Sequence, residues 1–157
     1  MTLADWLKNG WLIEHETSRQ EVSYILQLID RDLQDCQKTN LSADWRFNIA
    51  YNAALQCANL ALAVSGYRAG RESQHYRVIQ SLEYTVKMDL KSINKFDAFR
   101  KKRNTSEYDR AGVVSEIELD EIILFATELK EKVVAWLRKM HPGFMPNHEN
   151  QKGRAGE

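Results

Sequence analysis

Residues 42–66 read SADWRFNIAYNAALQCANLALAVSG, and this stretch decides the fold. Ser42 is a residue type that caps helix N-termini and Gly66 a type that ends helices, so the pattern predicts one long helix between them. Apolar residues occupy more than one side of that helix. This is typical of a helix surrounded by neighbours at a bundle centre, or one partly buried in a dimer contact. Its many alanines would let neighbouring backbones approach closely.

Two further helices are expected on the N-terminal side. Thr17 with Gln20, or Ser18 with Glu21, fits a capping box, in which side chains satisfy free backbone N–H groups at a helix start. Apolar residues recur behind it at three- and four-residue steps, which indicates an amphipathic helix of about 20 residues. A short helix over residues 3–12 is predicted before it.

Three helical segments are expected on the C-terminal side. After a polar connection at residues 67–74, apolar stripes predict a helix over residues 75–90 and a short one over residues 93–99. A capping box at Ser115 starts the clearest helix of the chain, and Pro142 stops it.

Residues 96–114 read FDAFRKKRNTSEYDRAGVV and contain the strongest functional signal, four consecutive cations. Successive helical residues lie about 100° apart, so Arg100 and Arg103 are expected to share a face beside the buried aromatic residues, with Lys101 and Lys102 directed outward. Guanidinium groups form bidentate contacts with phosphates, and lysines add diffuse charge. The run therefore indicates an anion or RNA site, with a solvated helix end as the alternative reading.

The sequence contains neither strand alternation nor a hairpin signal. The expected fold class is all-α: an antiparallel four-helix up-and-down bundle, with a short extra N-terminal helix and a short helix before a basic turn at residues 100–110. Residues 1–146 are expected to form a single helical-bundle domain. The remaining residues, 147–157, lack apolar periodicity and are expected to be a disordered tail.

Composition narrows the function classes. Lys plus Arg and Asp plus Glu number 22 each, so any nucleic-acid binding requires a local patch. No apolar run approaches the roughly 20 residues of a membrane span, and no signal-peptide pattern is present, so a cytoplasmic protein without membrane contact is expected. The spacing of Cys36 and Cys57 favours buried free thiols over a disulfide. Trp45 and Trp136 lie on apolar stripes and are expected in the core.

The pair Arg103-Asn104 and the residues after it resemble the signature of HEPN-domain proteins, small helical bundles of prokaryotic toxin–antitoxin and RNA-processing systems. The family pattern is an Arg, often followed by Asn, Asp or His, and then a His after four to six residues. Residues 45–54 resemble the alanine- and tyrosine-rich second helix of that family, and residues 66–79 its following turn and third helix. The resemblance covers roughly residues 17–140.

The resemblance implies a phosphate-binding role for Arg103 and a supporting polar role for Asn104. RNA would supply its own 2′-hydroxyl nucleophile, so neither a metal nor a cofactor is expected. The family also implies a homodimer whose two sites face each other. Some relatives carry a Tyr inside the motif that a nucleotidyltransferase partner modifies, and Tyr108 resembles it. Arg103 and Tyr108 are therefore the candidate catalytic residues.

The motif His is missing, because Tyr108, Asp109 and Arg110 occupy the positions where it would stand. Histidine suits proton transfer because its ordinary pKa is about 6.5, whereas Tyr titrates near 10 and Arg above 12. This departure favours a degenerate or regulated family member that binds RNA or nucleotide phosphates. The expected binding residues are the following: Arg100, Lys101, Lys102, Arg103, Asn104 and Arg110.

Two alternatives stay open. The first is a weak metal-independent endoribonuclease that uses Tyr108, Asp109 or a displaced His75 in place of the missing His. The resemblance puts His75 near the end of the bundle, within reach of the motif. The second alternative is a protein-interaction module that docks an acidic partner. No other histidine has a spacing that suggests a metal site.

Overall fold

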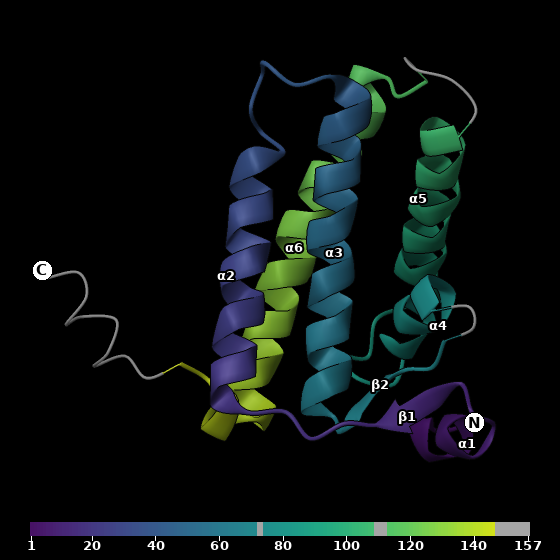
Figure 1. The fold of residues 1–157 in the computed structure, drawn as a ribbon, viewed down its shortest axis with the longest axis vertical. Coiled ribbons are helices and arrows are strands. Elements are labelled where there is room, and N and C mark those ends of the chain that lie inside the picture. The colour runs from purple at the N-terminus through teal and green to yellow at the C-terminus, as the bar shows by residue number, and fades with distance from the viewer. Residues whose placement is uncertain (72–73, 109–112, 147–157) are drawn as a thin grey trace, which may run out of the picture.

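A computed structural model describes residues 1–71, 74–108 and 113–146, without the side chains of residues 105–108. The described part of the chain is mainly helical, as predicted (Figure 1). The helices are α1 (Leu3–Lys8), α2 (Arg19–Asp35), α3 (Ala43–Val64), α4 (Gln74–Ser81), α5 (Leu90–Tyr108) and α6 (Glu116–Met140), followed by the short 3-10 helix η1 (Pro142–Phe144). The predicted tail at residues 147–157 lies outside the described residues.

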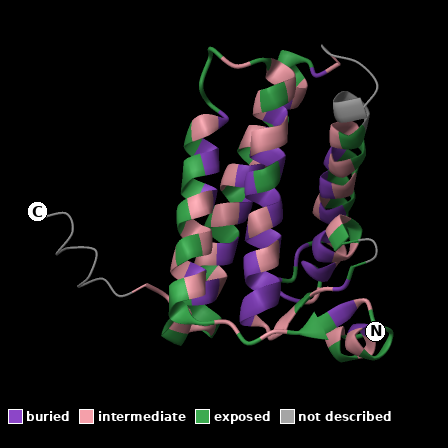
Figure 2. Ribbon diagram, viewed as in Figure 1, coloured by how far each residue is buried: buried purple, intermediate pink, exposed green. Residues whose placement is uncertain are grey.

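The central position predicted for the alanine-rich helix is confirmed. Helix α3 contacts α2, α4, α5 and α6, and Figure 2 shows buried residues along most of its length. The fully buried alanines Ala53 and Ala58 present only a methyl group, which lets the neighbouring helices pack closely.

Trp45 was expected in the core, and that prediction is wrong. It lies in the first turn of α3, at the end of the packed helices, and more than half of it is exposed.

The helix starts follow the capping predictions. The hydroxyl oxygens of Ser18 and Ser42 each accept a hydrogen bond at 3.1 Å, from the backbone N–H of Glu21 and Trp45 respectively. Ser115 and Glu118 form the full reciprocal capping box of α6. These residues satisfy backbone N–H groups that the helix itself leaves without partners, so the sequence defines where α2, α3 and α6 begin.

A small sheet departs from the all-helical expectation. Strand β1 (Leu12–Glu14) pairs antiparallel with β2 (Tyr67–Ala69), and Ile13 lies opposite Arg68. The helix predicted over residues 3–12 ends at Lys8, and Gly10, at φ +76°, turns the chain into β1. The sheet therefore ties the N-terminal segment to the loop that follows α3.

The basic run lies in a helix, and this corrects the predicted basic turn. The helix predicted over residues 75–90 ends at Ser81, and Lys87, at φ 58°, reverses the chain. Helix α5 then begins at Leu90, where the carboxylate of Asp89 accepts hydrogen bonds from the N–H and hydroxyl groups of Ser92. Arg and Lys are good helix formers, so the cations extend the helix that the aromatic residues begin.

An aromatic layer fills the space between α3, α5 and α6. The ring of Phe96 on α5 lies 5.1 Å from Phe125 of α6 and 5.9 Å from Tyr51 of α3, both in edge-to-face geometry. Phe99 contacts Phe125 at 5.5 Å and Phe47 at 6.0 Å. Edge-to-face pairs stabilise the packing beyond the area they bury. These rings hold α5 in place and with it the cations.

Two other expectations concern thiols and membranes. Cys36 and Cys57 are both buried and free, as predicted, and burial raises the pKa of the Cys57 thiol to about 12. Across residues 1–71, 74–108 and 113–146, no helix has the length and apolar character needed to cross a membrane.

Candidate functional site

Three of the four consecutive cations of α5 have the exposure that the helix geometry predicts. The Lys101 side chain is 70% exposed, whereas that of Arg100 is 22% exposed because it lies on the face that Phe96 and Phe99 bury. Arg103, one helical turn on, is also half-buried. Lys102 was expected to point outward, but it is half-buried because it reaches across to α6.

Carboxylates balance part of this positive charge. The Nε of Arg100 donates a 2.7 Å hydrogen bond to Asp97, and the Nζ of Lys101 lies 3.5 Å from the same carboxylate. The Nζ of Lys102 lies 3.1 Å from Glu118. The backbone N–H of Ser115, and then Lys102, hold the pKa of Glu118 below its ordinary value. These ion pairs offset part of the charge of Arg100, Lys101 and Lys102.

Arg103 lies against a buried tyrosine. Its guanidinium carbon is 5.3 Å from the ring centre of Tyr51, which is 1% exposed. Burial raises the pKa of the Tyr51 phenol to about 12, although Arg103 and Arg100 act in the opposite direction. The phenol therefore stays protonated at neutral pH. Its ring forms a cation–π contact with the guanidinium of Arg103.

His75 contacts this same tyrosine, and its place within reach of the motif stays a prediction. Its Nδ1 is 3.2 Å from the hydroxyl oxygen of Tyr51, and the two rings are 5.9 Å apart. His75 is half-buried in the first turn of α4. Helices α3, α4 and α5 thus bring a phenol, an imidazole and a guanidinium together. Tyr51 was missed as a site residue, although it lies in the segment that resembles the HEPN second helix.

For the other predicted site residues, the structure gives less detail. Asn104 is exposed on α5, one residue beyond Arg103. The backbone of Tyr108 ends α5, and its side chain is outside the description, as are Asp109 and Arg110. Among the described residues, no cluster of three or more His, Cys, Asp or Glu side chains suits a metal ion.

The remaining described histidines have structural partners. His15 lies 2.7 Å from the carboxylate of Glu21, which also accepts a hydrogen bond from the hydroxyl of Thr17. His141 packs edge-to-face on Trp136 at 4.8 Å. Trp136 itself is half-buried against the core, near the place predicted for it. These contacts join residues that flank α2 and α6 to those helices, and none of them involves Arg103.

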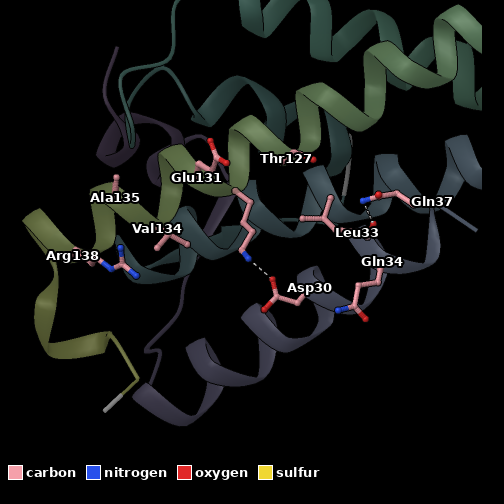
Figure 3. Close-up of a pocket in the computed structure, with 10 residues that line it drawn as sticks. Asp30, Leu33, Gln34, Gln37, Thr127, Glu131, Val134, Ala135 and Arg138 are labelled. Carbon is pink, nitrogen blue, oxygen red and sulfur yellow. Dashed lines mark hydrogen bonds and ion pairs between the residues drawn. The ribbon is translucent and has the colours of Figure 1, made fainter. Parts of the chain in front are cut away.

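A separate groove of about 640 Å³ lies between α2 and α6 (Figure 3). Lys130 and Asp30 form an ion pair across it, and Leu33 and Val134 are among the residues that line it. None of the predicted site residues that the structure describes lines it. Positive and negative side chains are mixed along its walls, so the groove offers no field that would select an anion.

Neither protein-family models nor curated proteins nor solved structures yielded a match to this chain. The function must therefore be argued from the arrangement of its own side chains.

Proposed function

We propose that this chain is a HEPN-like helical protein that binds RNA or nucleotide phosphates through the arginines of α5 and the polar side chains beside them. The observation that carries the proposal is the placement of Arg103 over Tyr51 beside His75. A guanidinium held by an aromatic ring is already oriented, so less side-chain entropy is lost when a phosphate binds. The carboxylate of Asp97 also orients Arg100, by accepting a hydrogen bond from its Nε.

Other parts of the proposal follow from the resemblance. In this proposal α2, α3, α5 and α6 form the four-helix up-and-down bundle of the family, and Figure 1 shows α2 and α5 running opposite to α3 and α6. Lys101, Lys102 and Asn104 extend the phosphate contacts, together with Arg110. The chain acts as a homodimer in the cytoplasm, in a toxin–antitoxin or RNA-processing system, with a nucleotidyltransferase-type partner acting on Tyr108.

Replacing Arg103 with alanine tests the binding role. We expect Arg103→Ala to weaken binding of single-stranded RNA about tenfold and to lower the slope of log K against log salt by about 0.7, because one phosphate contact is lost. Fluorescence anisotropy at several salt concentrations measures both quantities.

Lys95→Ala is the matched control, because Lys95 is an exposed cation on α5 that lies about two helical turns before Arg103. It should leave affinity and slope close to those of the wild type. If wild type does not bind RNA, or if the two variants behave alike, the proposal is wrong.

Metal-independent RNA cleavage is a second candidate, favoured by the 3.2 Å contact between His75 and Tyr51. In such cleavage the 2′-hydroxyl loses a proton and attacks phosphorus, the P–O5′ bond breaks, and the leaving oxygen takes a proton. An imidazole with an ordinary pKa near 6.5 suits either transfer, and Tyr51 would fix its orientation.

If His75 transfers protons, purified protein should cleave single-stranded RNA in the presence of EDTA. His75→Ala should then reduce the rate about 100-fold, while RNA affinity changes much less. Intact RNA with the wild type, or equal rates in the two proteins, would remove this candidate and leave the binding function standing.

A further inference from the structure

Three arginine–aromatic pairs follow one another across α5, α4 and the N-terminal segment. The guanidinium carbon of Arg103 lies 5.3 Å from the ring centre of Tyr51, and that of Arg100 lies 5.6 Å from Tyr76. Arg77 lies 3.6 Å from the ring centre of Trp11 and 5.5 Å from Tyr76. We call these six residues the arginine–aromatic strip.

The fold explains how distant parts of the sequence form the strip. The β1–β2 pairing holds the segment after α1 beside the loop that leads to α4, which places Trp11 against Arg77. Tyr76 and Arg77 are consecutive on α4, and Tyr76 meets Arg100 on α5. The HEPN-like signature includes neither Trp11 nor Arg77, so the strip extends well beyond the motif.

Several members of the strip are open to solvent. Tyr76 is 38% exposed, and Trp11, Arg77 and Arg100 are half-buried. Within residues 1–71, 74–108 and 113–146, no carboxylate forms an ion pair with Arg77, whose contacts are with aromatic rings. Among these described residues, the partners of the Arg77 guanidinium are therefore π-systems, which attract a cation without carrying a negative charge.

We infer that the arginine–aromatic strip binds a single-stranded RNA segment running from Arg103 toward Trp11; this inference rests on the proposed function. Grooves for single strands combine cations that follow the phosphates with aromatic rings on which bases stack. Tyr76 offers the exposed ring, and guanidinium planes offer further stacking surfaces. Duplex RNA keeps its bases stacked inside the helix, so a strip of this kind favours unpaired strands.

The test compares fluorescein-labelled oligouridylates of about 4 and about 12 nucleotides, bound to the full chain. Tyr76→Ala should weaken binding of the longer strand about tenfold, roughly the effect of one lost base stack, and Tyr76→Phe should retain affinity because the ring remains. Arg77→Gln should weaken the longer strand more than the shorter one, because Arg77 lies at the far end of the strip. Lys95→Gln is the matched control, and thermal unfolding of each variant confirms that it folds.

The possible outcomes distinguish failure of the arginine–aromatic strip from failure of the proposed RNA-binding function. Suppose that Arg103→Ala weakens binding while Tyr76→Ala and Arg77→Gln bind RNA with the same affinity as Lys95→Gln. The role of the strip would then be refuted, and the phosphate-binding role of Arg103 would be retained. Equal affinity for duplex and single-stranded RNA would also overturn the strip. So would displacement of the RNA by polyglutamate of equal charge, which would indicate an acidic protein partner. Absence of any RNA binding by the wild type would refute the proposed function itself.

Discussion

Phe96→Ala is expected to lower the free energy of unfolding by about 4 kcal/mol, because the change removes a large buried ring and leaves a cavity. Phe96 is fully buried, and its ring contacts Phe125 at 5.1 Å and Tyr51 at 5.9 Å. The lost ring joins three helices at once, so the neighbouring side chains cannot close the space without moving α5. Urea unfolding followed by circular dichroism measures the loss.

Lys95→Ala serves as the control for this prediction, since Lys95 is the preceding residue and is exposed. A surface substitution of this kind usually changes stability by about 0.5 kcal/mol or less. A loss of under about 1 kcal/mol for Phe96→Ala would mean that α5 does not depend on the aromatic layer. Arg103 lies two helical turns beyond Phe96, so the variant should also bind RNA more weakly under conditions where it is partly unfolded.

The long helices could be predicted from the sequence because their signals are local. The serine caps at residues 18, 42 and 115 sit directly before apolar stripes, and both the caps and the stripes are read within a few residues. The central position of α3 followed from its apolar residues on more than one side. A helix with one polar face would have been placed at the surface.

The small sheet could not be predicted because its cause is not local, whereas the start of α5 was missed although Asp89 and Ser92 form a local hydrogen-bonded contact there. Strands β1 and β2 have three residues each, too few to show alternation, and they pair across the whole of α2 and α3. Leu82 and Val86 are buried, as their stripe predicted, but they lie in the turns between α4 and α5. The periodic pattern therefore identified these buried residues correctly, but it predicted a helix where the backbone forms turns.

Only part of the candidate site could be predicted, because some of its contacts are local in sequence and others are not. Helical spacing was enough to place Arg100 and Arg103 beside the buried aromatic residues. The partners Tyr51 and Trp11 come from α3 and from the segment before β1, and only the tertiary fold brings them to the cations. A tyrosine on a helix that is apolar on several sides reads as core, and Tyr51 is indeed buried. Its hydroxyl contact with His75 has no signature in sequence.

Tyr51 should make the protein less stable in alkali. Its pKa is about 12 in the folded protein, raised by burial from the ordinary value of 10.0. Below pH 10 the phenol is protonated in both states, so its contribution to stability is fully present. Above pH 10 the unfolded chain loses this proton while the folded protein keeps it, which favours unfolding. The contribution is lost progressively until the pH passes about 12, and in total it amounts to about 3 kcal/mol.

The difference in unfolding free energy between wild type and Tyr51→Phe isolates this effect, because every other titrating group is common to both proteins. Phenylalanine keeps the ring beneath Arg103 and cannot ionise. Relative to that variant, the wild type should lose about half of the total by pH 11. A difference that stays constant from pH 8 to pH 11 would mean that water reaches the phenol. Arg103 and His75 would then pack against a solvent-accessible tyrosine. The claim that a buried ring orients both groups would be refuted.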